Sequence, residues 1–89
     1  MNKAVQVRIK GKVQGVGYRA ATLGKAKALG LRGYVKNEPD GDVTAFFEGT
    51  EAMIAAMLLW CESGPIRAKV TALITEYQAP RNYPDFSIV

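Results

Sequence analysis

A glycine-rich segment near the N-terminus holds the residues whose types and spacing are best suited to chemistry. It reads Gly11-Lys12-Val13-Gln14-Gly15-Val16-Gly17-Tyr18-Arg19. In a turn that glycine permits, successive backbone N–H groups converge on an anion, and a following helix N-terminus and the Arg19 guanidinium add positive charge. The segment therefore predicts an anion-binding cradle. The alternative is a plain turn between a strand and a helix with a surface arginine, because short glycine-rich motifs often match by chance.

The elements that position this cradle segment follow from hydrophobic periodicity. Apolar and polar residues alternate before it, and a weak helical pattern interrupted by Gly24 follows it and stops at Gly30. A second alternating stretch ends at Asn37 and returns through the turn Glu38–Gly41, as in a hairpin. The pattern predicts helices at 20–30 and 51–62, a hairpin at 31–48, and strands at 4–10, 67–77 and 86–88.

This order of elements predicts an α+β fold, the ferredoxin-like split β-α-β sandwich: βαββαβ plus a short C-terminal strand. Two helices would cover one face of a mostly antiparallel sheet, and the other face would lie open or thinly covered. The first two strands would run parallel with the third between them, so that both end at the same edge of the sheet. Asn37 is therefore expected beside Arg19.

Length and composition limit the classes of protein to which this chain can belong. The 89 residues suit one domain, residues 1–89, and no apolar run reaches the roughly 18 residues of a membrane span. The start, Met1–Ala4, runs into a strand without a leader-like apolar segment, so we expect a cytoplasmic protein. With Cys61 as its one cysteine and no histidine, the chain allows no internal disulfide and predicts no metal site and no cofactor. A net charge of +4 is compatible with an anionic ligand or with nucleic acid.

The second predicted helix, residues 51–62, is apolar over more than one face. Thr50 is a suitable N-cap, and Met53, Ile54, Ala56, Met57, Trp60 and Cys61 cover one arc. Leu58 and Leu59 fall partly outside this arc, which is explained by a wide core contact or by a self-association patch. We favour the core contact and expect a monomer.

An arginine, a group of backbone donors and an asparagine form a site without a nucleophile. Such a site binds an oxyanion and orients a water molecule, so any catalysis would rest on charge stabilisation and positioning, as in phosphoryl transfer. Asn37 is equally well explained as a turn residue before Pro39. Two other functions share these features: an anion-binding regulatory domain without turnover, and an RNA-recognition module, although adjacent Phe46 and Phe47 place at most one aromatic ring on the open face.

Two motifs resemble the acylphosphatase family. Gly11–Arg19 is similar to its first signature, Gly-x-Val-Gln-Gly-Val-x-Phe/Tyr-Arg, and Gly33–Val43 to its second, Gly-aromatic-Val-basic-Asn-x-x-x-Gly-x-Val. The intervening segment fits without a gap, and so do the Gly-Pro after the second helix and the final Phe-x-Ile. The resemblance covers essentially the whole chain. It departs from the family at Ala20 and Ala21, where a bulky aromatic is usual, and at Gly24.

The resemblance implies an enzyme that hydrolyses the carboxyl–phosphate bond of acyl phosphates without a metal. Arg19 would hold the phosphoryl group, and Asn37 would position the attacking water. The backbone N–H groups of Gly15, Val16, Gly17, Tyr18 and Arg19 would surround the phosphoryl group. Inorganic phosphate or sulfate would compete with the substrate, and neither nucleic acid nor a membrane would be a partner. The physiological acyl group is not specified by these residues.

Overall fold

The computed structural model describes residues 2–89. Met1, the first residue of the predicted domain, lies outside the described residues. The elements are β1 (Lys3–Lys12), α1 (Tyr18–Leu29), β2 (Arg32–Asn37), β3 (Val43–Gly49), α2 (Glu51–Cys61), β4 (Lys69–Gln78) and β5 (Phe86–Ile88). This order confirms the predicted βαββαβ arrangement with a short final strand. Helix α1 begins two residues earlier than its pattern predicts, directly after the glycine-rich turn.

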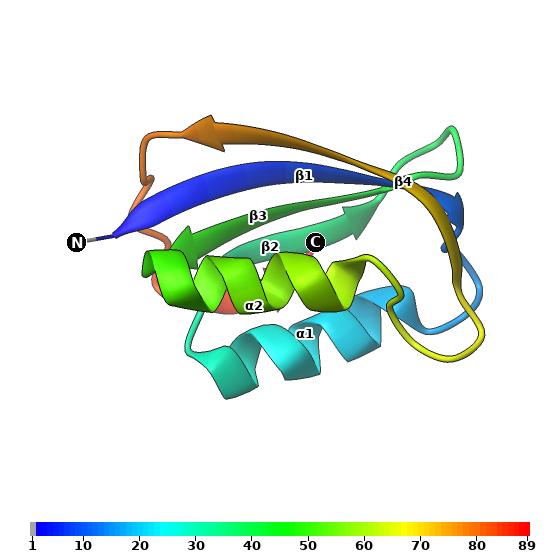
Figure 1. Ribbon diagram of the computed structural model, residues 1–89, viewed down its shortest axis with the longest axis horizontal. Coiled ribbons are helices and arrows are strands. Elements are labelled where there is room, and N and C mark those ends of the chain that lie inside the picture. The colour runs from blue at the N-terminus through cyan, green and yellow to red at the C-terminus, as the bar shows by residue number, and fades with distance from the viewer. Residues whose placement is uncertain (1) are drawn as a thin grey trace.

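The five strands form one sheet in the order β4-β1-β3-β2-β5. Strands β1 and β2 each pair antiparallel with β3, so they run parallel to each other on its two sides. Strand β4 pairs antiparallel with β1, and β5 pairs parallel with β2 at the opposite edge. Figure 1 shows both helices side by side on one face of the sheet. The predicted split β-α-β topology is confirmed.

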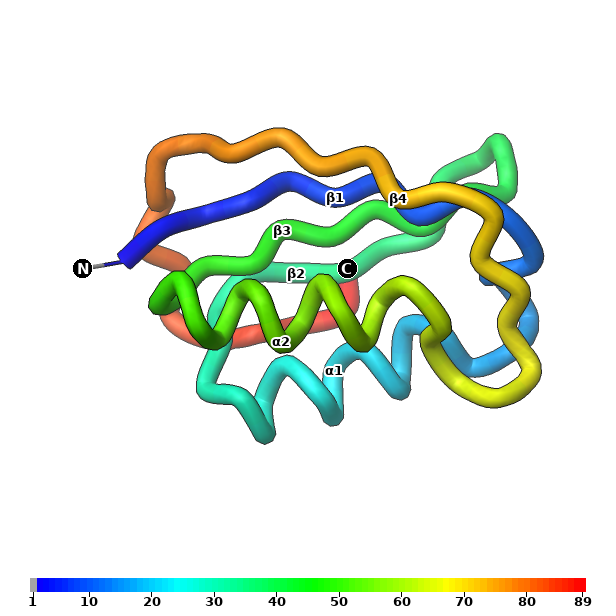
Figure 2. The backbone as a smooth tube through the Cα atoms, in the orientation of Figure 1, coloured from blue at the N-terminus to red at the C-terminus, as the bar shows by residue number. Residues whose placement is uncertain are grey.

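Alternation along β1 decides which residues enter the core. Val5, Val7 and Ile9 are fully buried on the helix side, whereas Arg8 and Lys10 face the other side. The same alternation on the partner strands and the inner faces of both helices completes the core, which includes Val35, Ala45, Phe47, Ile54 and Met57. Figure 2 shows the chain leaving α2, passing around the end of the sheet near the glycine-rich segment and entering β4.

The face opposite the helices is thinly covered by the segment between β4 and β5. Phe46 is fully buried there, with the Arg81 guanidinium 4.3 Å from its ring centroid and the Tyr83 ring centroid at 5.5 Å. Glu48, also fully buried, accepts hydrogen bonds from the backbone N–H groups of Arg81 and Asn82, both at 2.9 Å. A buried carboxylate satisfied in this way fixes the path of the covering segment.

Helix α1 buries two residues with hydroxyl groups, Tyr18 and Thr22, that its apolar pattern does not predict. By their spacing, Leu23, Ala26 and Leu29 can share one face of this helix. The fully buried residues are Tyr18, Thr22 and Ala26, and both leucines are half-buried. The Thr22 hydroxyl donates to the Tyr18 carbonyl at 2.7 Å, so this side chain is buried without an unpaired polar group. The helix stops at Gly30, as predicted, and this glycine adopts the left-handed conformation.

Gly24 is an exposed glycine in the middle of α1, and a Cβ added there would meet nothing within 4 Å. We expect Gly24→Ala to raise the free energy of unfolding by about 1 kcal/mol, since alanine loses less backbone entropy in a helix. Urea unfolding checks this, with Gly33→Ala as the contrast: Gly33 has φ 134° and its Cβ would collide with the Phe46 carbonyl. A destabilised Gly24→Ala protein would contradict the explanation.

Helix α2 begins as predicted, with the Thr50 hydroxyl accepting a hydrogen bond from the Met53 N–H at 3.2 Å. Leu58 is half-buried against the core, in agreement with a wide core contact, whereas Leu59 is 69% exposed. The prediction was wrong for Ala56, which lies on the exposed side. Small apolar residues fit either side of a helix, and periodicity therefore places them poorly.

Candidate active site

A cavity of about 250 Å³ lies where β1 and β2 end and α1 begins. This position follows from the topology, because parallel β1 and β2 bring their C-terminal ends to the same edge of the sheet. The cavity is smaller than the sites that hold drug-sized ligands, which suits a small ligand. The lining residues are Val13, Gln14, Gly15, Gly17, Tyr18, Arg19, Ala20, Asn37 and Ile88.

The two glycines of the loop adopt a backbone conformation that other residues rarely reach. Gly15 has φ 73° and Gly17 has φ 78°, both left-handed. Gly17 is also the N-cap of α1, and its carbonyl accepts from the Ala21 N–H at 3.0 Å. The N–H groups of the first turn, before Ala21, have no acceptor within the helix. Together with the helix dipole, they make this edge of the cavity favourable for an anion.

The structure brings most of the predicted site residues to this one cavity. Gly15, Gly17, Tyr18 and Arg19 line it from the loop and the start of α1, and Asn37 lines it from the end of β2. Val16 does not line the cavity, because its side chain is buried in the core. Its backbone still belongs to the loop, so its predicted role, which is that of a backbone donor, is compatible with this position.

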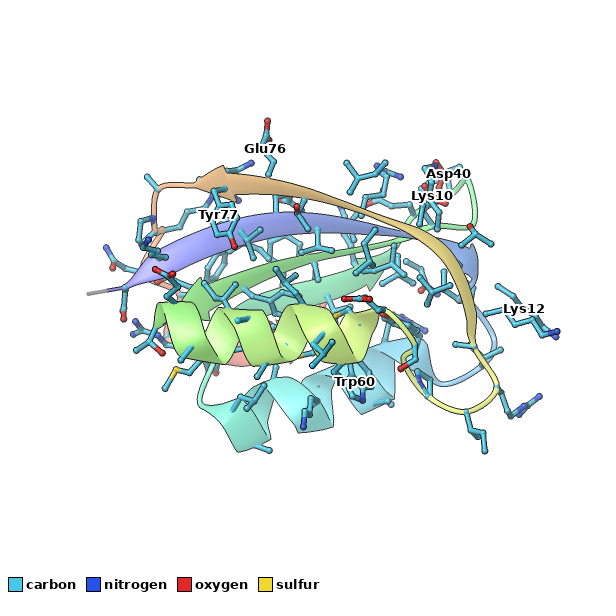
Figure 3. All side chains as sticks on the ribbon, viewed as in Figure 1. Lys10, Lys12, Asp40, Trp60, Glu76 and Tyr77 are labelled. Carbon is cyan, nitrogen blue, oxygen red and sulfur yellow. The ribbon has the colours of Figure 1, made fainter. Side chains whose placement is uncertain are left out.

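Tyr18 fixes the loop to the C-terminal end of α2. Its hydroxyl donates to the carbonyl of Cys61 at 2.8 Å, and its ring lies 5.7 Å from that of Trp60, which Figure 3 shows between the two helices. A Cβ on Gly64 would collide with the Tyr18 ring, so glycine is required for this close approach. Burial raises the pKa of Tyr18 and raises the pKa of the Cys61 thiol to about 12. Cys61 is therefore a neutral core residue at physiological pH.

Arg19 lines the cavity and forms no ion pair among the described residues. Within residues 2–89, no carboxylate oxygen lies within 4 Å of it, whereas Arg8 and Lys10 are both paired with Asp42. An unneutralised arginine at the edge of a cavity retains its full attraction for an anion, and its planar group contacts two oxygens at once.

Asn37 carries a buried polar atom without a partner. Its Oδ1 has no hydrogen-bond donor among the described residues. Leaving a buried acceptor unpaired costs about 1–3 kcal/mol, and native proteins rarely tolerate this without a functional reason. The backbone of Asn37 is held in register opposite Val43 of β3, so the side chain projects from a rigid strand end.

Sequence reasoning did not name four residues of the lining as site residues: Val13, Gln14, Ala20 and Ile88. Gln14 and Ala20 flank the predicted loop residues in sequence, which is a signal that could have found them. Ile88 has no such signal, because it reaches the cavity only through the parallel pairing of β5 with β2 opposite Val35.

Comparisons with known proteins agree with this geometry. Residues 5–88 match the family model of acylphosphatase. The chain belongs to the acylphosphatase family. It is 51% identical over 86 residues to an acylphosphatase of Rhodospirillum rubrum, covering 96% of this chain and 93% of that protein. The sandwich of this acylphosphatase also superposes on solved family members, from Coxiella burnetii with a TM-score of 0.96 and 34% identity, and from Bacillus subtilis with 0.95 and 31%.

These relatives match over nearly their whole length. The chain covers 93% of the Coxiella burnetii protein and 99% of the Bacillus subtilis protein, and they cover 99% and 100% of it. The chain is accordingly an acylphosphatase enzyme, and its reaction is the hydrolysis of acyl phosphates. Among residues 2–89, no helix is long and apolar enough to span a membrane.

The hairpin turn after Asn37 is tied to β1 by ion pairs. The Asp42 carboxylate lies 2.8 Å from Lys10 Nζ and 2.8 Å from Arg8 Nη1, and its side chain is only 11% exposed. Figure 3 shows Lys10 and Asp40 at this same end of the sheet. Hydrogen bonds from Lys10 and then Arg8 lower the pKa of Asp42 below its ordinary value. The acylphosphatase thus anchors one wall of its cavity through a mostly buried carboxylate.

Asp42→Asn is expected to destabilise the acylphosphatase at pH 7 but not in acid. A carboxyl with a lowered folded-state pKa stabilises the fold above its ordinary pKa of about 3.8, and this contribution is lost as the pH falls through the folded pKa. The difference in unfolding free energy between wild type and variant should therefore shrink below pH 3.8. Urea unfolding across this range measures it, with exposed Asp85→Asn as the control. A difference independent of pH would show that the charge is not responsible.

Proposed function

We propose that the cavity binds the phosphoryl group of an acyl phosphate through Arg19 and the backbone N–H groups of residues 15–19, while Asn37 orients the attacking water. The observation that carries this proposal is the Oδ1 of Asn37, which has no donor among residues 2–89 and belongs to the same cavity as Arg19. A water that donates to Oδ1 satisfies the buried acceptor and is thereby held close to the phosphoryl group. Asn37 fits this role better than that of a turn residue, because its side-chain oxygen accepts no hydrogen bond from the turn among the described residues.

The proposed reaction needs no strong acid or base from the protein. The water oxygen forms a bond to phosphorus while the bond between phosphorus and the acyl oxygen breaks. The acyl oxygen leaves as a carboxylate with the electron pair, and the proton lost by the water passes to phosphate or solvent. A carboxylate is a stable leaving group, and Arg19 together with the backbone donors stabilises the charge on the phosphoryl oxygens. The lining residues include no carboxylate, so no side chain there repels the anion.

Hydrolysis of benzoyl phosphate by the purified protein tests the proposal. We expect turnover that inorganic phosphate or sulfate inhibits competitively, because either anion occupies the same donors. We also expect full activity in the presence of excess chelator, because Arg19 and backbone groups supply the positive charge. Turnover that the chelator abolishes would contradict the metal-free part. Phosphate binding without turnover would identify the anion-binding regulatory domain instead.

The RNA-recognition alternative is disfavoured by the covered sheet face. Phe46 is the aromatic residue of β3 on that face, and it is fully buried beneath Arg81 and Tyr83. Base stacking requires an exposed ring.

We further propose that the enzyme is monomeric and cytoplasmic. The half-burial of Leu58 and the free thiol of Cys61 support this proposal, and the elution volume on size exclusion tests the monomer.

A further inference from the structure

Gln14 joins the two halves of the site. Its Nε2 donates to two backbone carbonyls of the β2–β3 turn, that of Glu38 at 2.8 Å and that of Asp42 at 2.9 Å. Glu38 directly follows Asn37, and Gln14 directly precedes Gly15. One side chain therefore links the loop that carries the backbone donors to the turn that begins at the proposed water-orienting residue.

The β2–β3 turn that accepts the hydrogen bonds of Gln14 is itself held by further contacts. The Glu38 N–H donates to the Asp42 carbonyl at 2.8 Å, and the Gly41 N–H donates to the Glu38 carbonyl at 3.2 Å. The Asp42 carboxylate is in turn held by Arg8 and Lys10 of β1. Because these contacts hold the turn, it moves as one unit with the Gln14 amide. The position of Gln14 therefore determines the position of the turn.

Both N–H bonds of the Gln14 amide are directed at carbonyls, so neither is available to a bound anion. We propose that Gln14 is a positioning residue, which sets the distance and direction of Asn37 relative to the phosphoryl cradle. This inference rests on the proposed function. Tyr18 separately fixes the loop to Cys61, so loss of the Gln14 link should disturb the alignment between the two halves more than the cradle itself.

Gln14→Met keeps the length of the side chain and removes both donors. We expect kcat for benzoyl phosphate to fall by about 10- to 100-fold, the scale of a misplacement of about 1 Å. The inhibition constant of inorganic phosphate should change less than threefold. Gln6→Met is the matched control, because Gln6 also donates from Nε2 to a backbone carbonyl, that of Ala45 at 3.2 Å, and does not line the cavity. Its kcat should stay within twofold of wild type.

Gln14→Glu separates a positioning role from a general loss of packing. An ionised carboxylate cannot donate to the two carbonyls, whereas a protonated one donates to one of them. We expect kcat of this variant, relative to wild type at the same pH, to recover in part as the pH falls through the range where glutamate is protonated. No dependence on pH in this ratio would argue against the hydrogen bonds.

The outcomes distinguish this inference from the proposed function. Wild type that does not hydrolyse any acyl phosphate overturns the proposed function, and the inference with it. Wild type that is active with an unchanged kcat for Gln14→Met overturns the inference alone. If that variant does not fold, the side-chain amide protons of Gln14 in labelled wild type are observed by NMR. Slow exchange of both protons with solvent supports the link, and fast exchange contradicts it.

Discussion

Arg19→Ala is expected to lower kcat/KM for benzoyl phosphate by roughly 10³- to 10⁵-fold, the range found when an arginine that stabilises a phosphoryl transition state is removed. Arg19 is unpaired within the described residues, so its removal leaves no carboxylate unsatisfied and the fold should be unaffected. Both the binding of inorganic phosphate and turnover should weaken. Steady-state kinetics and phosphate inhibition measure the two effects separately.

Two further variants sharpen the Arg19 experiment. Arg19→Lys restores the charge but not the planar pair of donors, so its activity should lie between those of Arg19→Ala and wild type. Arg67→Ala removes an exposed arginine of the α2–β4 connection and should leave activity unchanged. If Arg19→Ala retained normal phosphate inhibition, the arginine would not hold the anion.

Asn37→Ala is expected to lower kcat by about 10²- to 10³-fold, comparable to the loss of one polar group that acts in a transition state. The inhibition constant of phosphate should change little, because the variant removes the orienting group for water and leaves the anion donors in place. The free energy of unfolding should stay equal or rise slightly, since the alanine side chain has no buried oxygen that lacks a donor. Kinetics and urea unfolding of the same preparations give both values.

Asn37→Asp keeps the shape of the side chain and adds negative charge near Arg19. We expect Asn37→Asp to weaken phosphate binding and to lower kcat. This result would show the effect of added charge at this position when the side-chain shape is unchanged. Weakened phosphate binding in Asn37→Ala with an intact kcat would show instead that Asn37 contacts the anion.

The fold was predictable from the sequence because its signals are local. Alternation marks β1 through Val5, Val7 and Ile9, and the turn residues from Glu38 to Gly41 mark the hairpin. The order of helices and strands then allows few topologies for the sheet. The residues of α1 that are buried were less predictable, because the burial of Thr22 depends on a hydrogen bond to the Tyr18 carbonyl that periodicity does not describe.

The site was predictable where motif residues are close in sequence or where topology brings strand ends together. Asn37 and Arg19 line one cavity because β1 and β2 run parallel around β3. Ile88 and the grip of Gln14 on the hairpin turn were not predictable. The first depends on where the last strand pairs, and the second on the side-chain geometry of residues 24 and 28 positions apart.

The insertion of β3 between β1 and β2 has a consequence for the nascent chain. Both motifs are complete once Val43 has been synthesised, yet β1 and β2 each pair with β3, which lies between them and ends at Gly49. A chain released or stalled before β3 leaves the ribosome would carry every proposed catalytic residue and still lack the cavity. Closing these non-local pairings sets the pace of folding. Enzyme activity should therefore appear only with the pairing of β3, not with the synthesis of the residues that carry it.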